Sequence, residues 1–275
     1  MKNFFELFNK KNPNLELEVE ELSNKAINFH DNFNKSKWRK DKSFHNSDHI
    51  RACLQACEIL VKKAMMGEDP LRIKEDLERW NQNQRSNISL DEFLLIITLA
   101  YSFHDLGNIA DLQNGKIVFL NTYTSNQAEE RSKRIAEYLI RESKLPQDKK
   151  KRWLDLILYL IEETKFQIQD PQRPFALLVR FIDQIGGNLF NQNRNRIFGL
   201  ILELVEEKGE ISINPYEFFN FVNLQARKLL NDPNVLEKVL EIWGKRLPEL
   251  DNRYPNTIII LNKENVLDFI SSLPS

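Results

Sequence analysis

Apolar residues recur at helical spacing along most of this chain, and few residues interrupt them. The 275-residue sequence contains only 8 glycines and 10 prolines. Long amphipathic segments with few helix breakers are typical of helical proteins, so we predict an all-α fold without internal repeats. The predicted helices cover residues 15–33, 45–66, 70–81, 90–104, 125–142, 148–164, 173–186, 194–208, 215–231 and 234–247.

Cap residues mark several of the predicted helix ends. Ser89 precedes an acidic turn and then an apolar run, and Asn214 precedes a proline. Both patterns are typical of helix starts, because a side-chain oxygen there accepts hydrogen bonds from free backbone N–H groups. The pair Gly186 and Gly187 predicts a helix stop, since glycine adopts the left-handed conformation that ends many helices.

Two short segments and one polar stretch complete the predicted organisation. Residues 115–120 and 257–261 are short and β-branched, so each fits a strand or buried coil equally well and both stay unassigned. The composition turns polar near residue 192, and no histidine follows. We therefore predict a helical domain at residues 15–190 and a C-terminal helical extension, residues 195–275, packed on it.

Composition limits the classes to which this chain can belong. The 39 basic and 40 acidic side chains nearly balance, so we expect no bulk nucleic-acid binding and no charge-driven membrane contact. No apolar run reaches bilayer length, and the first apolar stretch contains Glu6 and lacks the cleavage site of a signal peptide. Cys53 and Cys57 are too few for a secreted disulfide framework, and we expect both in the core. These features favour a cytoplasmic protein.

Three of the four histidines fall in patterns that suit a metal site. His45 and His49 are four residues apart, which puts both side chains on one face if the segment is helical. The alternative is that His45 precedes or caps the helix and that His49 is a hydrogen-bonded surface residue. His104 and Asp105 follow a long apolar run, where a carboxylate is costly unless it is paired or coordinates an ion.

Asp183 and His30 are two further residues that could belong to a metal site. Asp183 interrupts the apolar run 177–182 and is a further candidate ligand, with a helical Arg180 pair as the alternative. His30 precedes Asp31 but has no histidine upstream, so we assign this pair a structural role. Imidazole and carboxylate groups suit divalent Mn, Fe, Co, Ni or Zn, and water on such an ion is a nucleophile near neutral pH. The pattern therefore points to hydrolysis.

The order of these residues resembles the metal signature of the HD superfamily of metal-dependent phosphohydrolases. His49, then the pair His104 and Asp105, then the distal Asp183 follow that signature. Residues 44–50 resemble the Tyr-His-Asn-x-x-His segment of cyclic-nucleotide phosphodiesterases and of small predicted HD hydrolases, with phenylalanine in place of the tyrosine. Further matches with the small hydrolases lie at residues 102–107, 126–132, 160–166 and 181–186.

The resemblance covers roughly residues 25–190 and implies both a fold and a metal centre. The implied fold is an HD-domain-like helical bundle, which makes residues 15–190 an HD-type metal-binding domain. The implied cofactor is one divalent cation, such as Mn, Mg, Fe, Co, Ni or Zn, and a second ion could share Asp105. The implied metal ligands are His49, His104, Asp105 and Asp183.

The resemblance also implies a reaction, which is hydrolysis of a small phosphorylated substrate, with a nucleotide as the substrate class that the family suggests. In the family pattern His45 would protonate the leaving oxygen, and His45 and Asp105 are the predicted catalytic residues. The candidate substrate-binding cations are Arg51, Lys116, Arg131, Lys165 and Arg180. The candidate carboxylates around the ligands are Glu129, Glu130 and Glu163.

Two other functions fit parts of this pattern. Some HD proteins bind a pair of irons and oxidise carbon bonds, but they use extra histidines, and this chain has none after His104. A non-catalytic module that binds a nucleotide or a protein partner in the same pocket is the other alternative. The extension after residue 195 could then cover the pocket or mediate a homo-oligomer.

Overall fold

Helices account for most of the residues that this computed structural model describes, which are 13–35, 44–165, 172–190, 195–247 and 249–273. The predicted all-α fold is therefore confirmed. The first helices are α1 (Pro13–Lys35), α2 (Ser47–Met65), α3 (Ile73–Gln84), α4 (Leu90–Phe103), α5 (Ala128–Glu142) and α6 (Gln147–Glu163).

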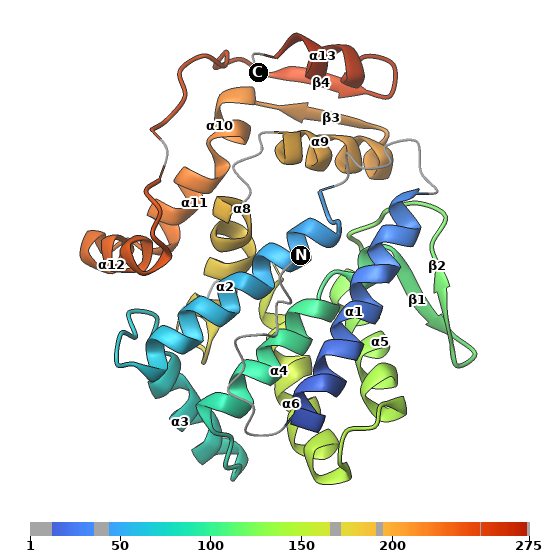
Figure 1. The fold of residues 1–275 in the computed structure, drawn as a ribbon. Coiled ribbons are helices and arrows are strands. Elements are labelled where there is room, and N and C mark those ends of the chain that lie inside the picture. The colour runs from blue at the N-terminus through green and yellow to red at the C-terminus, as the bar shows by residue number, and fades with distance from the viewer. Residues whose placement is uncertain (1–12, 36–43, 166–171, 191–194, 248, 274–275) are drawn as a thin grey trace.

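Helix α4 lies at the centre of this group, with α1, α2, α5 and α6 packed against it (Figure 1). Every residue from Phe93 to Phe103 is buried, which explains why this helix is apolar on all sides. Its start is the predicted one. The side chain of Ser89 accepts a hydrogen bond from the Glu92 N–H, and Glu92 accepts one from the Ser89 N–H, which forms a capping box.

The helix predicted over residues 45–66 begins at Ser47, two residues late. The cause is Asn46, whose side-chain oxygen accepts hydrogen bonds from the backbone N–H groups of Asp48 and His49, each at 3.0 Å. His45 therefore precedes the helix, as the alternative in the sequence analysis had it, and the two histidines do not share a helical face. The loop still brings the rings of His45 and His49 to a centroid distance of 5.9 Å.

The helix predicted over residues 173–186 does not stop at its glycine pair. Gly187 has a helical φ of −59°, and the chain continues in helical form. A Cβ on Gly186 would lie 2.8 Å from the Trp243 ring, and one on Gly187 would lie 2.7 Å from Cys53 Sγ. The glycines therefore serve close packing and not termination. The helical stretch consists of α7 (Ala176–Arg180), the π-helical turn η3 (Phe181–Gly186) and α8 (Gly187–Phe190).

The two segments left unassigned by the sequence are strands. Residues 115–120 contain β2 (Lys116–Phe119), which pairs with β1 (Ala110–Gln113) in an antiparallel hairpin. Residues 257–261 contribute to β4 (Ile259–Asn262), which pairs antiparallel with β3 (Glu210–Ile213). The C-terminal extension is therefore not purely helical, because β3 and β4 lie within it. A short 3-10 turn, η2 (Leu106–Asn108), connects α4 to the hairpin.

The extension also divides its helices differently from the prediction. The helix expected over residues 215–231 is interrupted at Asn220, whose side chain donates to the Tyr216 carbonyl at 2.8 Å and accepts from the Asp251 N–H at 3.0 Å. The helix expected over residues 234–247 ends earlier because Gly244 takes a left-handed φ of +64°. The helices here are α9 (Asn195–Lys208), α10 (Pro215–Phe219), α11 (Phe221–Leu229), α12 (Pro233–Trp243) and α13 (Val266–Ser272).

Two clusters of buried apolar side chains organise the described part of the chain. The larger lies among α1 to α7 and includes Val239 and Trp243 of α12. The smaller joins one face of α9 to β3, β4 and α13, around Ile201 and Leu261. The upper part of Figure 1 shows α9 beneath these strands and α13. The boundary between a domain at 15–190 and an extension stays a prediction.

None of the helices that the structure describes combines the length and the apolar composition needed to cross a membrane.

Candidate metal centre

Side chains from three separate helical segments meet at one point. His49 comes from the first turn of α2, His104 follows the last turn of α4, and Asp183 lies in the π-helical turn η3. One ligand atom from each lies within 4.8 Å of the others, so the three could hold a metal ion. Asp183 Oδ1 lies 3.5 Å from His49 Nε2 and 3.3 Å from His104 Nε2. π-Helical turns occur frequently at functional sites.

Asp105 adds a second carboxylate to the same point. Its Oδ2 lies 3.1 Å from His104 Nε2 and 3.6 Å from His49 Nε2. Its other oxygen, Oδ1, accepts a hydrogen bond of 3.0 Å from the Asn108 side chain, which fixes the carboxylate with Oδ2 toward the histidines. The four residues expected as ligands are therefore neighbours in the structure.

Helix α5 supports the turn that carries His104 and Asp105. Ser132 Oγ donates to the His104 carbonyl at 2.6 Å and accepts from the Gly107 N–H at 2.8 Å. A Cβ on Gly107 would lie only 1.8 Å from the Ala128 carbonyl oxygen, so α5 can pack this closely only on glycine. The end of α4 is thus fixed by packing as well as by sequence.

The hydrogen bonds around His104 leave its inner nitrogen available to a cation. His104 Nδ1 donates to the Tyr101 carbonyl at 2.8 Å, so Nε2 is the nitrogen that faces the cluster and would bind a cation after giving up its proton. His104 Nε2 and Asp105 Oδ2 are both buried and make no hydrogen bond within the described residues. Buried polar atoms normally have partners, and a cation among these atoms would satisfy both. The donor set therefore fits a divalent metal.

The charges in the cluster also call for a cation. Burial favours neutral carboxyl groups, yet the rings of His104 and His45 hold the pKa of Asp105 well below its usual range. The rings of His104 and His49, with Nε2 atoms 3.3 and 3.5 Å from Asp183 Oδ1, likewise outweigh burial and lower the pKa of Asp183 to about 2. Between these two carboxylates the pKa of His104 is raised despite its burial, whereas burial lowers the pKa of His49. The carboxylates therefore stay ionised and favour positive charge between them.

His45 lies beside the cluster and is bound to a carboxylate that the sequence analysis missed. Its Nδ1 donates to Glu203 Oε2 at 2.6 Å, and its backbone N–H donates to Glu203 Oε1 at 3.1 Å. Its Nε2 lies 4.0 Å from Asp105 Oδ2. Burial alone would lower the pKa of His45, but the carboxylates of Asp105 and Glu203 raise it to about 9. His45 therefore carries a proton on the nitrogen that faces the cluster.

Glu203 could have been found by the argument that selected Asp183. It is fully buried in α9, where it interrupts the apolar run 200–205. A lone carboxylate in such a run needs a partner, and the partner here is a histidine 158 residues earlier in the chain. The sequence contains the signal for an unusual glutamate but not the identity of its partner.

His30 contributes to the position of His45 from the opposite side. His30 Nδ1 donates to the His45 carbonyl at 3.2 Å, and Asn34 Nδ2 donates to the same oxygen at 3.5 Å. Burial lowers the pKa of His30 to about 4, so this ring is neutral. The contact fits the structural role predicted for the His30-Asp31 pair.

Two of the predicted substrate cations have their donors engaged elsewhere. Arg131 donates from Nε, Nη1 and Nη2 to the carbonyls of Gly107, Asn126 and Thr124 at 2.6, 2.6 and 3.0 Å. The Arg131 side chain therefore links separate backbone segments, and these contacts account for its burial. Lys165 forms ion pairs with Glu130 at 3.3 Å and Glu162 at 2.5 Å.

The other three predicted cations lie on three different elements. Arg51 pairs with Asp48 at 3.4 Å on the exposed side of α2. Lys116 is exposed on β2. Arg180 lies on α7 within electrostatic range of Glu163. None of these placements assigns a cation to the candidate metal centre, and the role of all five in substrate binding stays a prediction.

The three predicted outer carboxylates have different environments. Glu129 is half-buried on α5, and its pKa is raised first by burial and also by the nearby charge of Asp105. Glu130 pairs with Lys133 at 2.8 Å on the surface. Glu163 is fully buried and pairs with Arg173 at 2.7 Å. Of these, Glu129 has an electrostatic link to a candidate ligand, and Glu130 and Glu163 belong to ion pairs.

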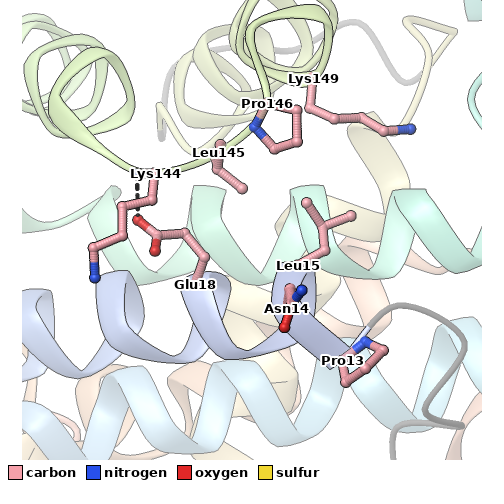
Figure 2. A pocket seen from close by; sticks show the side chains of 8 residues that line it. All are labelled: Pro13, Asn14, Leu15, Glu18, Lys144, Leu145, Pro146 and Lys149. Atoms are coloured by element: carbon pink, nitrogen blue, oxygen red, sulfur yellow. Dashed lines mark hydrogen bonds between the residues drawn. The ribbon is translucent and has the colours of Figure 1, made fainter.

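The centre opens to solvent on one side. The side chains of Asp183 and His45 are 23% and 15% exposed, whereas those of His49 and His104 are 1% and 2% exposed. A substrate would therefore approach past Asp183 and His45. The cavity in Figure 2, of about 350 Å³, is a different place, because residues such as Leu15 and Lys149 line it and none of the cluster does.

No family model, curated protein or solved structure matches this chain. The function of the site therefore has to be inferred from its own residues and geometry.

Proposed function

We propose that this chain is a metal-dependent phosphoester hydrolase of the HD type. The observation that carries the proposal is the convergence of two histidines and two aspartates on one point, with the ring of His45 beside them and bound through Nδ1 to Glu203. A metal site alone would serve binding or structure. The added proton donor is what hydrolysis of an ester with a poor leaving group requires.

The metal ligands would be Nε2 of the two histidines and one oxygen from each aspartate. The set of His49, His104, Asp105 and Asp183 suits Mn, Fe, Co, Ni or Zn, and Mg is a further candidate. A divalent cation there would acidify a water molecule and neutralise charge that develops on the phosphoryl oxygens. The Tyr101 carbonyl and the Asn108 side chain would keep His104 and Asp105 in the orientation needed for binding.

His45 would protonate the leaving oxygen. Its Nδ1 is committed to Glu203, so the proton available for transfer is the one on Nε2. That nitrogen lies 4.0 Å from Asp105 and at the open side of the centre, where an ester oxygen would enter. Glu203 favours the protonated ring, so the donor is ready when the substrate binds. The substrate class suggested by the family resemblance is a small phosphorylated molecule, with nucleotides as the first candidates.

The proposal is tested by a turnover screen of the purified chain. Phosphomonoesters, cyclic nucleotides and nucleoside polyphosphates should each be assayed with Mn²⁺, Mg²⁺, Co²⁺, Ni²⁺, Zn²⁺ and Fe²⁺. We expect phosphate release with at least one metal and its loss on addition of a chelator. The variant with His104→Ala and Asp105→Ala is the matched negative control, since it removes two ligands from one turn.

Two results would contradict the proposal. Turnover of no phosphoester with any metal would favour a non-catalytic binding module, above all if the double variant still bound nucleotide. Two tightly bound irons together with oxygen consumption would favour an oxygenase.

A further inference from the structure

Helix α9 contacts a second segment near the metal centre besides His45. Glu207, one turn after Glu203, accepts hydrogen bonds from three groups of two neighbouring residues. Its Oε1 accepts from the Ser125 N–H at 2.6 Å, from Ser125 Oγ at 2.8 Å and from Thr124 Oγ1 at 3.2 Å. Its Oε2 lies 3.0 Å from Ser125 Oγ. A single carboxylate thus binds the backbone and both hydroxyls of this segment.

The residue before this anchored pair is Tyr123, which is buried and stacks on His45. The two rings lie 5.2 Å apart between centroids and are inclined by 23°. Tyr123 therefore covers one face of the His45 ring, while Glu203 binds its Nδ1. Residues four apart on a helix lie on the same face, so Glu203 and Glu207 act from one side of α9.

The same segment is also bound from the side of the metal ligands. The Thr124 N–H donates to the Asn108 carbonyl at 3.1 Å, and Arg131 Nη2 donates to the Thr124 carbonyl at 3.0 Å. Asn108 is the residue whose side chain orients Asp105. Residues 123–125 therefore join α9 to the turn that carries Asp105, and the connection passes directly behind the His45 ring.

We propose that Glu207 is a positioning residue for the proton donor, and that it acts by anchoring residues 123–125 so that Tyr123 keeps the His45 ring in place. The inference rests on the proposed hydrolase function. In this arrangement the hydrogen bond to Glu203 fixes the direction in which His45 Nδ1 points. The stacked Tyr123 ring prevents the His45 ring from tilting about that hydrogen bond. The two carboxylates of α9 thus have distinct tasks.

The test begins with the imidazole ring itself and needs no substrate. The chain has only four histidines, so ¹⁵N-histidine NMR of the metal-free protein can follow each ring separately. We expect Glu207→Ala to shift or broaden the His45 ring signals and to leave those of His104 unchanged. Glu237→Ala, at an exposed position of α12, is the matched control and should change neither. Unchanged His45 signals in Glu207→Ala would overturn the proposal.

Turnover gives the second readout, with Mn²⁺ and the best phosphoester found in the screen. Glu207→Ala should lower kcat about tenfold with KM and Mn²⁺ affinity nearly unchanged, because a misplaced donor affects the chemical step. Glu207→Gln, which keeps an acceptor oxygen, should restore part of the rate. An equal loss of Mn²⁺ affinity would show that Glu207 supports the metal centre as a whole and would contradict the assigned role.

A double-mutant cycle tests whether Glu207 acts through Tyr123. Tyr123→Ala should reproduce the loss in kcat, Tyr123→Phe should retain most of the rate, and adding Glu207→Ala to Tyr123→Ala should have little further effect. Independent, additive losses would contradict the path through the tyrosine. If the wild type hydrolyses no phosphoester, the hydrolase proposal fails, and the NMR result still decides whether Glu207 positions His45.

Discussion

The two parts of this molecule supply different groups to one site. Helices α2 and α4 and the turn η3 contribute the side chains that converge as a candidate metal centre, and these elements belong to the large apolar core. Helix α9, whose apolar face belongs to the small second core, contributes the buried carboxylate of Glu203 and the half-buried carboxylate of Glu207. The two parts therefore have different proposed roles. The first part would bind the cation, and the second would control the proton donor.

This division implies that metal binding and turnover can be separated by mutation. Changes to the ligands should abolish both. Changes to His45 or to α9 should reduce turnover and leave the cation bound.

The largest effect is expected from His104→Ala combined with Asp105→Ala. This variant removes an imidazole and an ionised carboxylate from the same turn, so both metal affinity and turnover should fall to background. Calorimetric titration with Mn²⁺ and a phosphate-release assay measure the two quantities. Asp31→Ala, in the other His-Asp pair of the sequence, is the matched control and should keep both metal affinity and turnover. Retained turnover in the double variant would refute the assigned centre.

The next largest effect is expected from His45→Ala, which removes the proton donor and spares the ligands. Loss of general-acid catalysis should lower kcat by about 10² to 10⁴-fold with Mn²⁺ affinity unchanged. The loss should be smaller for a p-nitrophenyl ester, because that leaving group departs without a proton. An equal loss for p-nitrophenyl and alkyl esters would mean that His45 has another role.

A smaller effect, with a characteristic pH dependence, is expected from Glu203→Gln. The pKa of His45 is raised to about 9, so the wild-type rate should hold below that pH and fall as the pH rises through it. Removing the Glu203 charge lowers the pKa of His45, so the upper limb of the kcat profile should move to lower pH. At neutral pH the loss in kcat should be roughly 10-fold, less than for His45→Ala. If the upper limb of the kcat profile does not move, the His45–Glu203 pair is not what keeps the proton donor protonated.

The same pair makes a prediction for stability. The pKa of His45 is higher in the folded chain than its ordinary 6.5, so its contribution to stability is complete below 6.5 and is lost as the pH rises through about 9. The difference in melting temperature between the wild type and Glu203→Gln should therefore shrink over this window. A difference that grows with pH would have the wrong sign.

The smallest effect is expected from Gly187→Ala, which alters the centre by packing alone. The new Cβ would lie 2.7 Å from Cys53 Sγ and 3.4 Å from His49 Cε1, so it should displace a candidate ligand slightly and weaken Mn²⁺ binding by less than about 10-fold. Gly186→Ala is the matched control, because its Cβ would meet the Trp243 ring at 2.8 Å instead. Equal losses of Mn²⁺ affinity in the two variants would show that the effect is general destabilisation.

The sequence predicts those features that depend on local pattern or on one unusual side chain. Apolar periodicity was sufficient for most helices, and carboxylates in apolar runs identified Asp105 and Asp183, which the structure places beside His49 and His104. Features that depend on close contacts between distant segments were not accessible. Gly187 predicts a stop by its conformational freedom, but the chain uses it because α2 passes too near for a side chain.

Partners far apart in the sequence account for the other differences. Glu203 lies 158 residues after His45, and no spacing rule connects them. Arg131 was a candidate substrate cation by its charge, yet its donors meet three backbone carbonyls that only the folded loop presents. Strands β3 and β4 are short and separated by 45 residues, and they become recognisable only when paired. Tertiary contacts, which a single sequence does not encode in any local pattern, decide each of these.

The most direct test of the central claim is anomalous diffraction at the manganese edge from crystals grown with Mn²⁺. We expect one strong peak within bonding distance of His49, His104, Asp105 and Asp183, with His45 still paired to Glu203. A second, weaker peak beside Asp105 would add an ion without changing that result. No peak among these four residues in excess Mn²⁺, or a peak elsewhere on the protein alone, would contradict the account.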